Sequence, residues 1–180
     1  MARKDTKVIR KRLVYEGFFD FREDILLDHN EQEYQYNFLV AKAEACAILP
    51  EIEEDKFVLT YEYRYPVGKT ILSCPGGRLD DGEDPVFGAK RELLEETGYE
   101  AKEMINLHLF YPFPSVCDQR VHLFLAKGLT KVAEPNLDPL EEIETTILSM
   151  AEIKKLDYAE FPADGVLHSL LFHRSLYLSD

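Results

Sequence analysis

The chain contains 180 residues, of which 46% are hydrophobic and 31% charged, with nine glycines and nine prolines. This composition is typical of one soluble globular domain with room for a small subdomain, and it excludes collagen, coiled-coil and disordered proteins. No apolar run approaches the roughly 20 residues of a membrane-spanning helix, and the N-terminus lacks the apolar stretch of a secretory signal. We therefore expect a cytoplasmic protein without a membrane partner.

The net charge of −13 is distributed unevenly along the chain. Residues 1–14 carry a local charge of +5, so residues 15–180 carry −18. Such an acidic surface repels a nucleic-acid backbone, and we expect no nucleic-acid partner. The three cysteines are widely spaced, which favours reduced thiols over a disulfide framework or a zinc site.

Alternating polar and apolar residues predict strands in the first third of the chain. The alternation covers 12–28 and 34–49, and we expect a turn at Pro50. It continues over 56–64, where β-branched and aromatic residues are frequent. A loop rich in glycine and proline follows over 66–82.

The next pattern predicts a helix over 85–97. Asp84 suits the N-cap, Pro85 suits the first helical position, and Gly98 suits a left-handed stop. A last helix is expected to open at Pro162. Three more strands are expected near 105–111, 120–126 and 143–148. The fold class is therefore α+β, or mixed α/β.

Three carboxylates, Glu92, Glu95 and Glu96, stand at positions i, i+3 and i+4 of the predicted helix. Their side chains share one face over a single turn, where like charges repel. A divalent cation such as Mg²⁺ or Mn²⁺, which prefers oxygen ligands, would reverse the sign of this interaction. The alternative is a solvated acidic face in an acidic protein, and the triplet by itself does not separate the two.

A wider pattern around the triplet favours the metal. The spacing reads Gly77-x5-Glu83-x7-Arg91-Glu92-Leu93-x-Glu95-Glu96-x-Gly98-Tyr99. It matches the Nudix box, G-x5-E-x7-R-E-U-x-E-E-x-G-U with U a bulky apolar residue, and so many constrained positions make a chance match very rare. The chain thus resembles a Nudix hydrolase.

The resemblance implies a mixed sheet sandwiched between helices in a hydrolase domain at 46–180. It also implies an N-terminal antiparallel β subdomain at 1–45, which serves dimerisation and substrate contacts. An ion pair between Glu83 and Arg91 would position the catalytic carboxylates. The implied ligands of Mg²⁺ (or Mn²⁺) are Glu92, Glu96 and the carbonyl oxygen of Gly76, with Glu95 as a further ligand or as the group that activates water.

The segments around the box resemble the ADP-ribose pyrophosphatase and nucleoside-diphosphate-sugar hydrolase branch. The segment 61–68, Y-E-Y-R-Y-P-V-G, and the proline at 114 carry this resemblance. It implies a homodimer that hydrolyses the pyrophosphate bond of a sugar nucleotide to a nucleoside monophosphate and a sugar phosphate. ADP-ribose, GDP-mannose and related sugar nucleotides all remain open. The implied substrate-binding residues are Arg64, Phe21 and Pro114.

Three positions depart from the pattern of this branch. Ser73 and Gln119 each replace a glutamate, and Pro139 stands where the general base is often found. Glu141 matches the second acid of this late loop and is the candidate metal ligand or base, with Glu142 as its neighbour. The lost acids keep two alternatives open, a non-hydrolytic nucleotide-sugar sensor and a Nudix hydrolase of another nucleotide class.

Overall fold

The computed structural model describes residues 7–137, 139, 141–160 and 162–179, and these form two compact units. The first unit is Met1–Glu44 with Phe113–Gln119, and the second is Ala45–Pro112 with Arg120–Asp180. The first unit thus contains a distant segment, 113–119, that the expected boundary at 45 assigns to the hydrolase domain.

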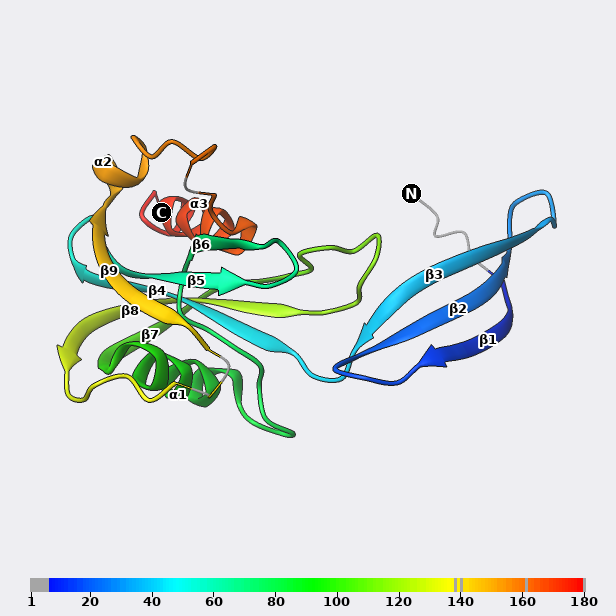
Figure 1. Ribbon diagram of the computed structural model, residues 1–180, viewed down its shortest axis with the longest axis horizontal. Helices are drawn as coiled ribbons and strands as arrows, with labels where there is room; N and C mark the ends of the chain where they lie inside the picture. Colours follow the sequence, from blue (N-terminus) through cyan, green and yellow to red (C-terminus); the bar gives the residue numbers. More distant parts are fainter. Residues whose placement is uncertain (1–6, 138, 140, 161, 180) are drawn as a thin grey trace. The chain divides into compact units, whose positions relative to one another are not determined.

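The first unit is a three-stranded antiparallel sheet (Figure 1). Its strands are β1 (Lys7–Tyr15), β2 (Phe19–Leu27) and β3 (Glu33–Ala41), in the order β1-β2-β3. The segment 113–119 attaches to β3: the backbone N–H of Leu39 donates to the carbonyl of Val116 over 2.8 Å, and the N–H of Ala41 donates to Asp118 Oδ1 over 2.7 Å.

The second unit is built on a six-stranded mixed sheet, in the order β6-β5-β4-β8-β7 with β9 paired to β5. Strands β4 and β8 run parallel, and the other neighbours are antiparallel. The strands are β4 (Ala45–Glu53), β5 (Lys56–Arg64), β6 (Lys69–Ser73), β7 (Tyr99–Phe110), β8 (Val121–Lys131) and β9 (Ile143–Ser149).

Helices cover both faces of this sheet, as Figure 1 shows. Helix α1 (Pro85–Thr97) packs on one face and α3 (Gly165–Tyr177) on the other, while the short α2 (Met150–Ile153) follows β9. Side chains alternate along β4 accordingly: Ile48 faces α1 and Leu49 faces α3. The expected mixed α/β fold is confirmed, and no helix of the described residues is long and apolar enough to cross a membrane.

Two expected boundaries were wrong. Pro50 lies inside β4, opposite Ala126 of β8, and the turn comes later, at Asp55. Pro50 needs no N–H there, because β5 pairs with β4 only from Glu51 onward.

The last helix opens at Gly165 and not at Pro162. Asp164 is the N-cap, and its Oδ1 accepts a hydrogen bond from the N–H of Val166 over 2.7 Å. A carboxylate that takes up a free helical N–H fixes the start of the helix more firmly than a proline two residues earlier.

An almost completely buried ion pair joins α3 to the sheet. Arg174 of α3 and Glu51 of β4 are 4% and 7% exposed, and the Arg174 Nη2 donates to Glu51 Oε1. Arg174 Nη1 also pairs with Asp55 at 2.8 Å, and the guanidinium lies over the Phe57 ring. Burial makes this pair costly to break, because the remaining charge would lose both water and partner.

We expect Arg174→Leu to lower the free energy of unfolding by ~3 kcal/mol, since it leaves Glu51 as an insufficiently paired buried charge. Urea denaturation measures this loss. The matched control is Lys56→Met, which removes an exposed ion pair of 2.7 Å with Glu53 and should hardly change the midpoint. Equal midpoints for both variants would show that the buried pair does not hold α3 in place.

Candidate active site

Helix α1 is fixed at both ends and along its buried face. Asp84 Oδ1 accepts from the N–H of Val86 over 2.9 Å, and Gly98, with φ of 71°, ends the helix in the left-handed conformation. Ala89 and Leu93 are fully buried against the sheet. The prediction of a helix over 85–97 is confirmed, and its acidic face is thereby held in one orientation.

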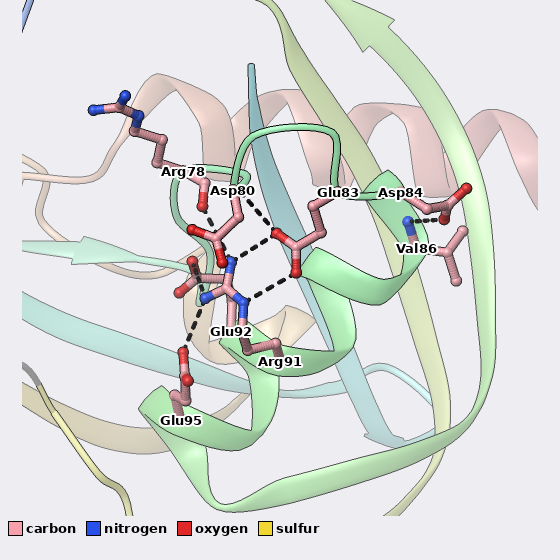
Figure 2. A network of polar contacts seen from close by, with 8 residues as sticks. All are labelled: Arg78, Asp80, Glu83, Asp84, Val86, Arg91, Glu92 and Glu95. Carbon is pink, nitrogen blue, oxygen red and sulfur yellow. Dashed lines mark hydrogen bonds and ion pairs between the residues drawn. The ribbon is translucent and has the colours of Figure 1, made fainter. Parts of the chain in front are cut away.

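Arg91 is the centre of a network of carboxylates, which Figure 2 shows. Its Nε and Nη2 donate to the two oxygens of Glu83 over 3.1 and 3.0 Å, a bidentate arrangement. Its Nη1 donates to Glu92 over 2.9 Å and to Glu95 over 3.0 Å, and Nη2 also reaches the carbonyl of Arg78. Hydrogen bonding from Arg91 lowers the pKa of Glu83, so Glu83 is held as an anion.

Glu96 lies deeper and has a different partner. It is 6% exposed, and its Oε2 accepts from the backbone N–H of Gly76 over 3.0 Å. Burial raises the pKa of Glu96 to about 9, with smaller contributions in the same direction from the charges of Glu92, Glu141 and Glu62. A carboxyl group of this kind binds either a proton or a cation at neutral pH.

The two glycines before the helix allow the loop to approach the acids. Gly76 has φ of 151°, and a Cβ there would strike the carbonyl oxygen of Cys46. A Cβ on Gly77 would come within 2.5 Å of Glu92 Oε1. Only glycine fits at position 76, where the clash is with backbone, whereas a Cβ at position 77 would require the Glu92 side chain to move.

A further carboxylate, Glu62 of β5, belongs to the same region, and the sequence reasoning missed it. Burial raises the pKa of Glu62, the neighbouring charge of Arg64 lowers it, and the charges of Glu141 and Asp164 raise it again. These charges therefore lie near Glu62. The signal in the sequence was the strand alternation, which places Glu62 and Arg64 on one face of β5.

The donor set suits a hard divalent cation, because all candidate ligands are oxygens. As the side chains stand, Glu92 and Glu95 both accept from Arg91, while Glu96 accepts from Gly76. Among the described residues, no three His, Cys, Asp or Glu side chains are already gathered as a metal-binding group. Burial raises the pKa of Glu92 as well, which leaves Glu92 and Glu96 poorly solvated as anions and suited to accept a cation.

The other predicted site residues lie in several parts of the chain. Arg64 ends β5 in the second unit, whereas Phe21, in β2, and Pro114 belong to the first unit. Ser73 is buried at the end of β6. In the late acidic loop, Asp138 and Leu140 lie outside the described residues; Pro139, Glu141 and Glu142 are described.

Comparison with known proteins agrees with this geometry. Residues 41–170 match the NUDIX domain. An ADP-ribose pyrophosphatase of Bacillus subtilis is 33% identical over 159 residues, which are 87% of this chain and 85% of the relative. A methanol dehydrogenase activator of Bacillus methanolicus is 43% identical over 100 residues, 56% of this chain and 53% of the relative.

The fold has a close counterpart among solved structures. The crystal structure of an ADP compounds hydrolase superposes with a TM-score of 0.85 at 22% identity, covering 99% of this chain and 97% of that one. The family match spans well over half of the chain and includes every acid of the Arg91 network. The chain belongs to the Nudix family.

Proposed function

We propose that the protein hydrolyses the pyrophosphate bond of a nucleoside diphosphate sugar in a Mg²⁺-dependent reaction, with ADP-ribose as the first candidate substrate. The products would be AMP and ribose 5-phosphate. The observation that carries the proposal is the intact acidic face of α1, with Glu96 buried against the N–H of Gly76. The Bacillus subtilis relative is an ADP-ribose pyrophosphatase, which supports the substrate class.

Within this proposal, the metal site is built from α1 and the loop before it. Glu92, Glu96, Glu95 and the carbonyl oxygen of Gly76 would hold Mg²⁺ (or Mn²⁺). The bound metal would neutralise charge on the pyrophosphate and supply an activated water. Arg91 and Glu83 keep the carboxylates oriented, because their bidentate pair fixes the guanidinium.

The general base is assigned to Glu141. Strand β9 pairs with β5 so that Ile143 lies opposite Glu62, and Glu141 precedes Ile143 by two residues. The charge of Glu141 raises the pKa of both Glu62 and Glu96, so Glu141 lies near these two carboxyl groups. Pro139 has no side-chain group that could accept a proton. Glu142 is one residue from Ile143, so alternation would turn its side chain to the opposite face, and it is the second choice.

Substrate contacts are proposed for Arg64, Phe21 and Pro114. A guanidinium such as that of Arg64 suits bidentate contact with a phosphate. An aromatic ring such as Phe21 suits stacking on a nucleobase.

The direct test is a panel of nucleotides incubated with and without Mg²⁺, with products separated by chromatography. The panel contains ADP-ribose, GDP-mannose, ADP-glucose, UDP-glucose, NADH and dNTPs. We expect metal-dependent release of a nucleoside monophosphate from one or more sugar nucleotides. Tight ADP-ribose binding without hydrolysis of any compound would instead identify a sensor, and hydrolysis of dNTPs alone would identify another nucleotide class.

We expect Glu96→Gln to lower kcat by about 100-fold or more, because it removes the most buried anionic ligand of the proposed metal site. Steady-state kinetics at limiting Mg²⁺ measures the effect. Glu100→Gln, an exposed carboxylate at the start of β7, is the matched control and should leave kcat unchanged. Unchanged turnover of Glu96→Gln would contradict the ligand assignment.

The pKa of Glu96 also predicts how the metal-free protein responds to pH. An unfolded chain releases this proton near pH 4.5, whereas the folded protein keeps it up to about pH 9. The folded state therefore binds the extra proton in between, and Glu96 reduces stability progressively as the pH rises through this window.

Glu96→Gln removes this titration, so its Tm in EDTA should exceed that of the wild type by more at pH 8 than at pH 5. Added Mg²⁺ should raise the Tm of the wild type only. Thermal melts at both pH values measure the two differences. A Tm difference that does not change between pH 5 and pH 8 would show that Glu96 is ionised in the metal-free fold.

We also propose a homodimer formed through the first unit. Its strands expose several large apolar side chains, and no helix of this unit's described residues covers the sheet. The apolar face of a sheet is stable in water only when it packs against another element. The exposed side chains include Val8, Leu13, Tyr15 and Tyr34.

Replacing Val8 and Leu13 of β1 by Asp should convert the dimer to a monomer and raise KM for the sugar nucleotide. Light scattering coupled to size-exclusion chromatography gives the mass, and Glu33→Gln, an exposed change on β3, is the control. A monomeric wild type, or a doubly substituted chain that stays dimeric, would refute the proposed interface.

A further inference from the structure

One face of β5 carries an uncommon row of polar side chains toward its end. Thr60, Glu62 and Arg64 alternate with Leu59, Tyr61 and Tyr63 along the strand. Phe57, Leu59 and Tyr61 pack in the core beneath α3, so Thr60, Glu62 and Arg64 point to the side of the sheet that carries α1. The row therefore lies on the side of the Nudix carboxylates.

Strand pairing on both sides of β5 brings this row to the site. On one side, Ser73 of β6 lies opposite Thr60, and three residues later Gly76 donates to Glu96. On the other side, Ile143 of β9 lies opposite Glu62, and the same register continued by two residues would put Glu141 opposite Arg64. Both neighbouring strands thus lead from β5 into the proposed metal site.

Glu62 and Arg64 form an ion pair in this row. Arg64 Nη1 and Glu62 Oε1 are 2.5 Å apart, and the Glu62 side chain is only 14% exposed while that of Arg64 is 45% exposed. The carboxylate is thus the anchored partner and the guanidinium the accessible one. An arginine has five N–H donors, so one nitrogen can stay on Glu62 while the others contact a phosphate.

We propose that Glu62 is a positioning residue that holds the guanidinium of Arg64 beside the metal-binding carboxylates, so that one pyrophosphate contacts metal and arginine together. The inference rests on the proposed function. It adds Glu62, which lies outside the Nudix box, to the residues of the proposed site. The ion pair would favour substrate binding by preorganisation, because an Arg64 side chain that is already oriented loses less conformational freedom when the phosphate binds.

The test is a double-mutant cycle with the full chain: wild type, Glu62→Gln, Arg64→Ala and the double variant. Steady-state kinetics with ADP-ribose gives KM and kcat, and a Mg²⁺ titration gives the midpoint of activation. Calorimetric binding of ADP-ribose in EDTA repeats the cycle without turnover. Glu53→Gln, an exposed carboxylate in an ion pair near the other end of β5, is the matched control.

If Glu62 acts through Arg64, Glu62→Gln raises KM and weakens binding about three- to tenfold in the wild-type background and has no effect in the Arg64→Ala background. The Mg²⁺ midpoint and kcat stay within about twofold, a range well below the expected shift in KM. Glu62→Asp, which keeps the charge, should recover part of the loss. The Gln variant is nearly isosteric, and an unchanged Tm would confirm that it folds.

The opposite results separate the two proposals. An equal loss in both backgrounds, or a shifted Mg²⁺ midpoint, would mean that Glu62 acts on the metal directly and would overturn the inference alone. A wild type that binds ADP-ribose without hydrolysing it would overturn the proposed hydrolysis, while the binding cycle still decides the role of Glu62. A wild type that neither binds nor hydrolyses ADP-ribose would overturn both.

Discussion

The mutual repulsion of carboxylates on one turn of α1 is the constraint on which the site depends. Two kinds of contact offset this repulsion. Glu92 and Glu95 share the guanidinium of Arg91, which is itself fixed by both oxygens of Glu83. Glu96 lies on the buried side of the turn and instead meets the N–H of Gly76. In the proposed metal site, Glu96 would exchange its proton for the cation, and Glu92 and Glu95 would exchange part of their contact with Arg91 for it.

The sheet supplies the second half of the site. Alternation along β5 separates a core face under α3 from a polar face toward α1, and pairing with β6 and β9 carries the loop of Gly76 and the loop of Glu141 to that polar face. The buried ion pair between Arg174 and Glu51 holds α3 against the opposite face. The rigidity of the core thus determines where charged groups from distant parts of the chain meet.

Local signals in the sequence were sufficient for α1 and its acids, because capping residues, helical spacing and the Nudix box lie within 23 consecutive residues, 77–99. Long-range pairing left no such signal. Pro50 looked like a turn because proline usually ends a strand, yet one edge of β4 needs no N–H at that point. Strand alternation places Glu62 on the same face as Arg64, but it does not show that β6 and β9 bring this face to the acids of α1, because their register with β5 is a property of the folded sheet.

The course of the chain between β7 and β8 has a consequence for how the protein is made. The segment 113–119 belongs to the first unit, although the strands on either side of it belong to the second. Synthesis proceeds from the N-terminus, so the N–H groups of β3 can donate to Val116 and Asp118 only after most of the strands of the second unit's sheet have been translated. The N-terminal unit is therefore the first to begin translation, yet it cannot be completed until residue 119 has been added, when β8, β9 and α3 of the second unit are still to be made.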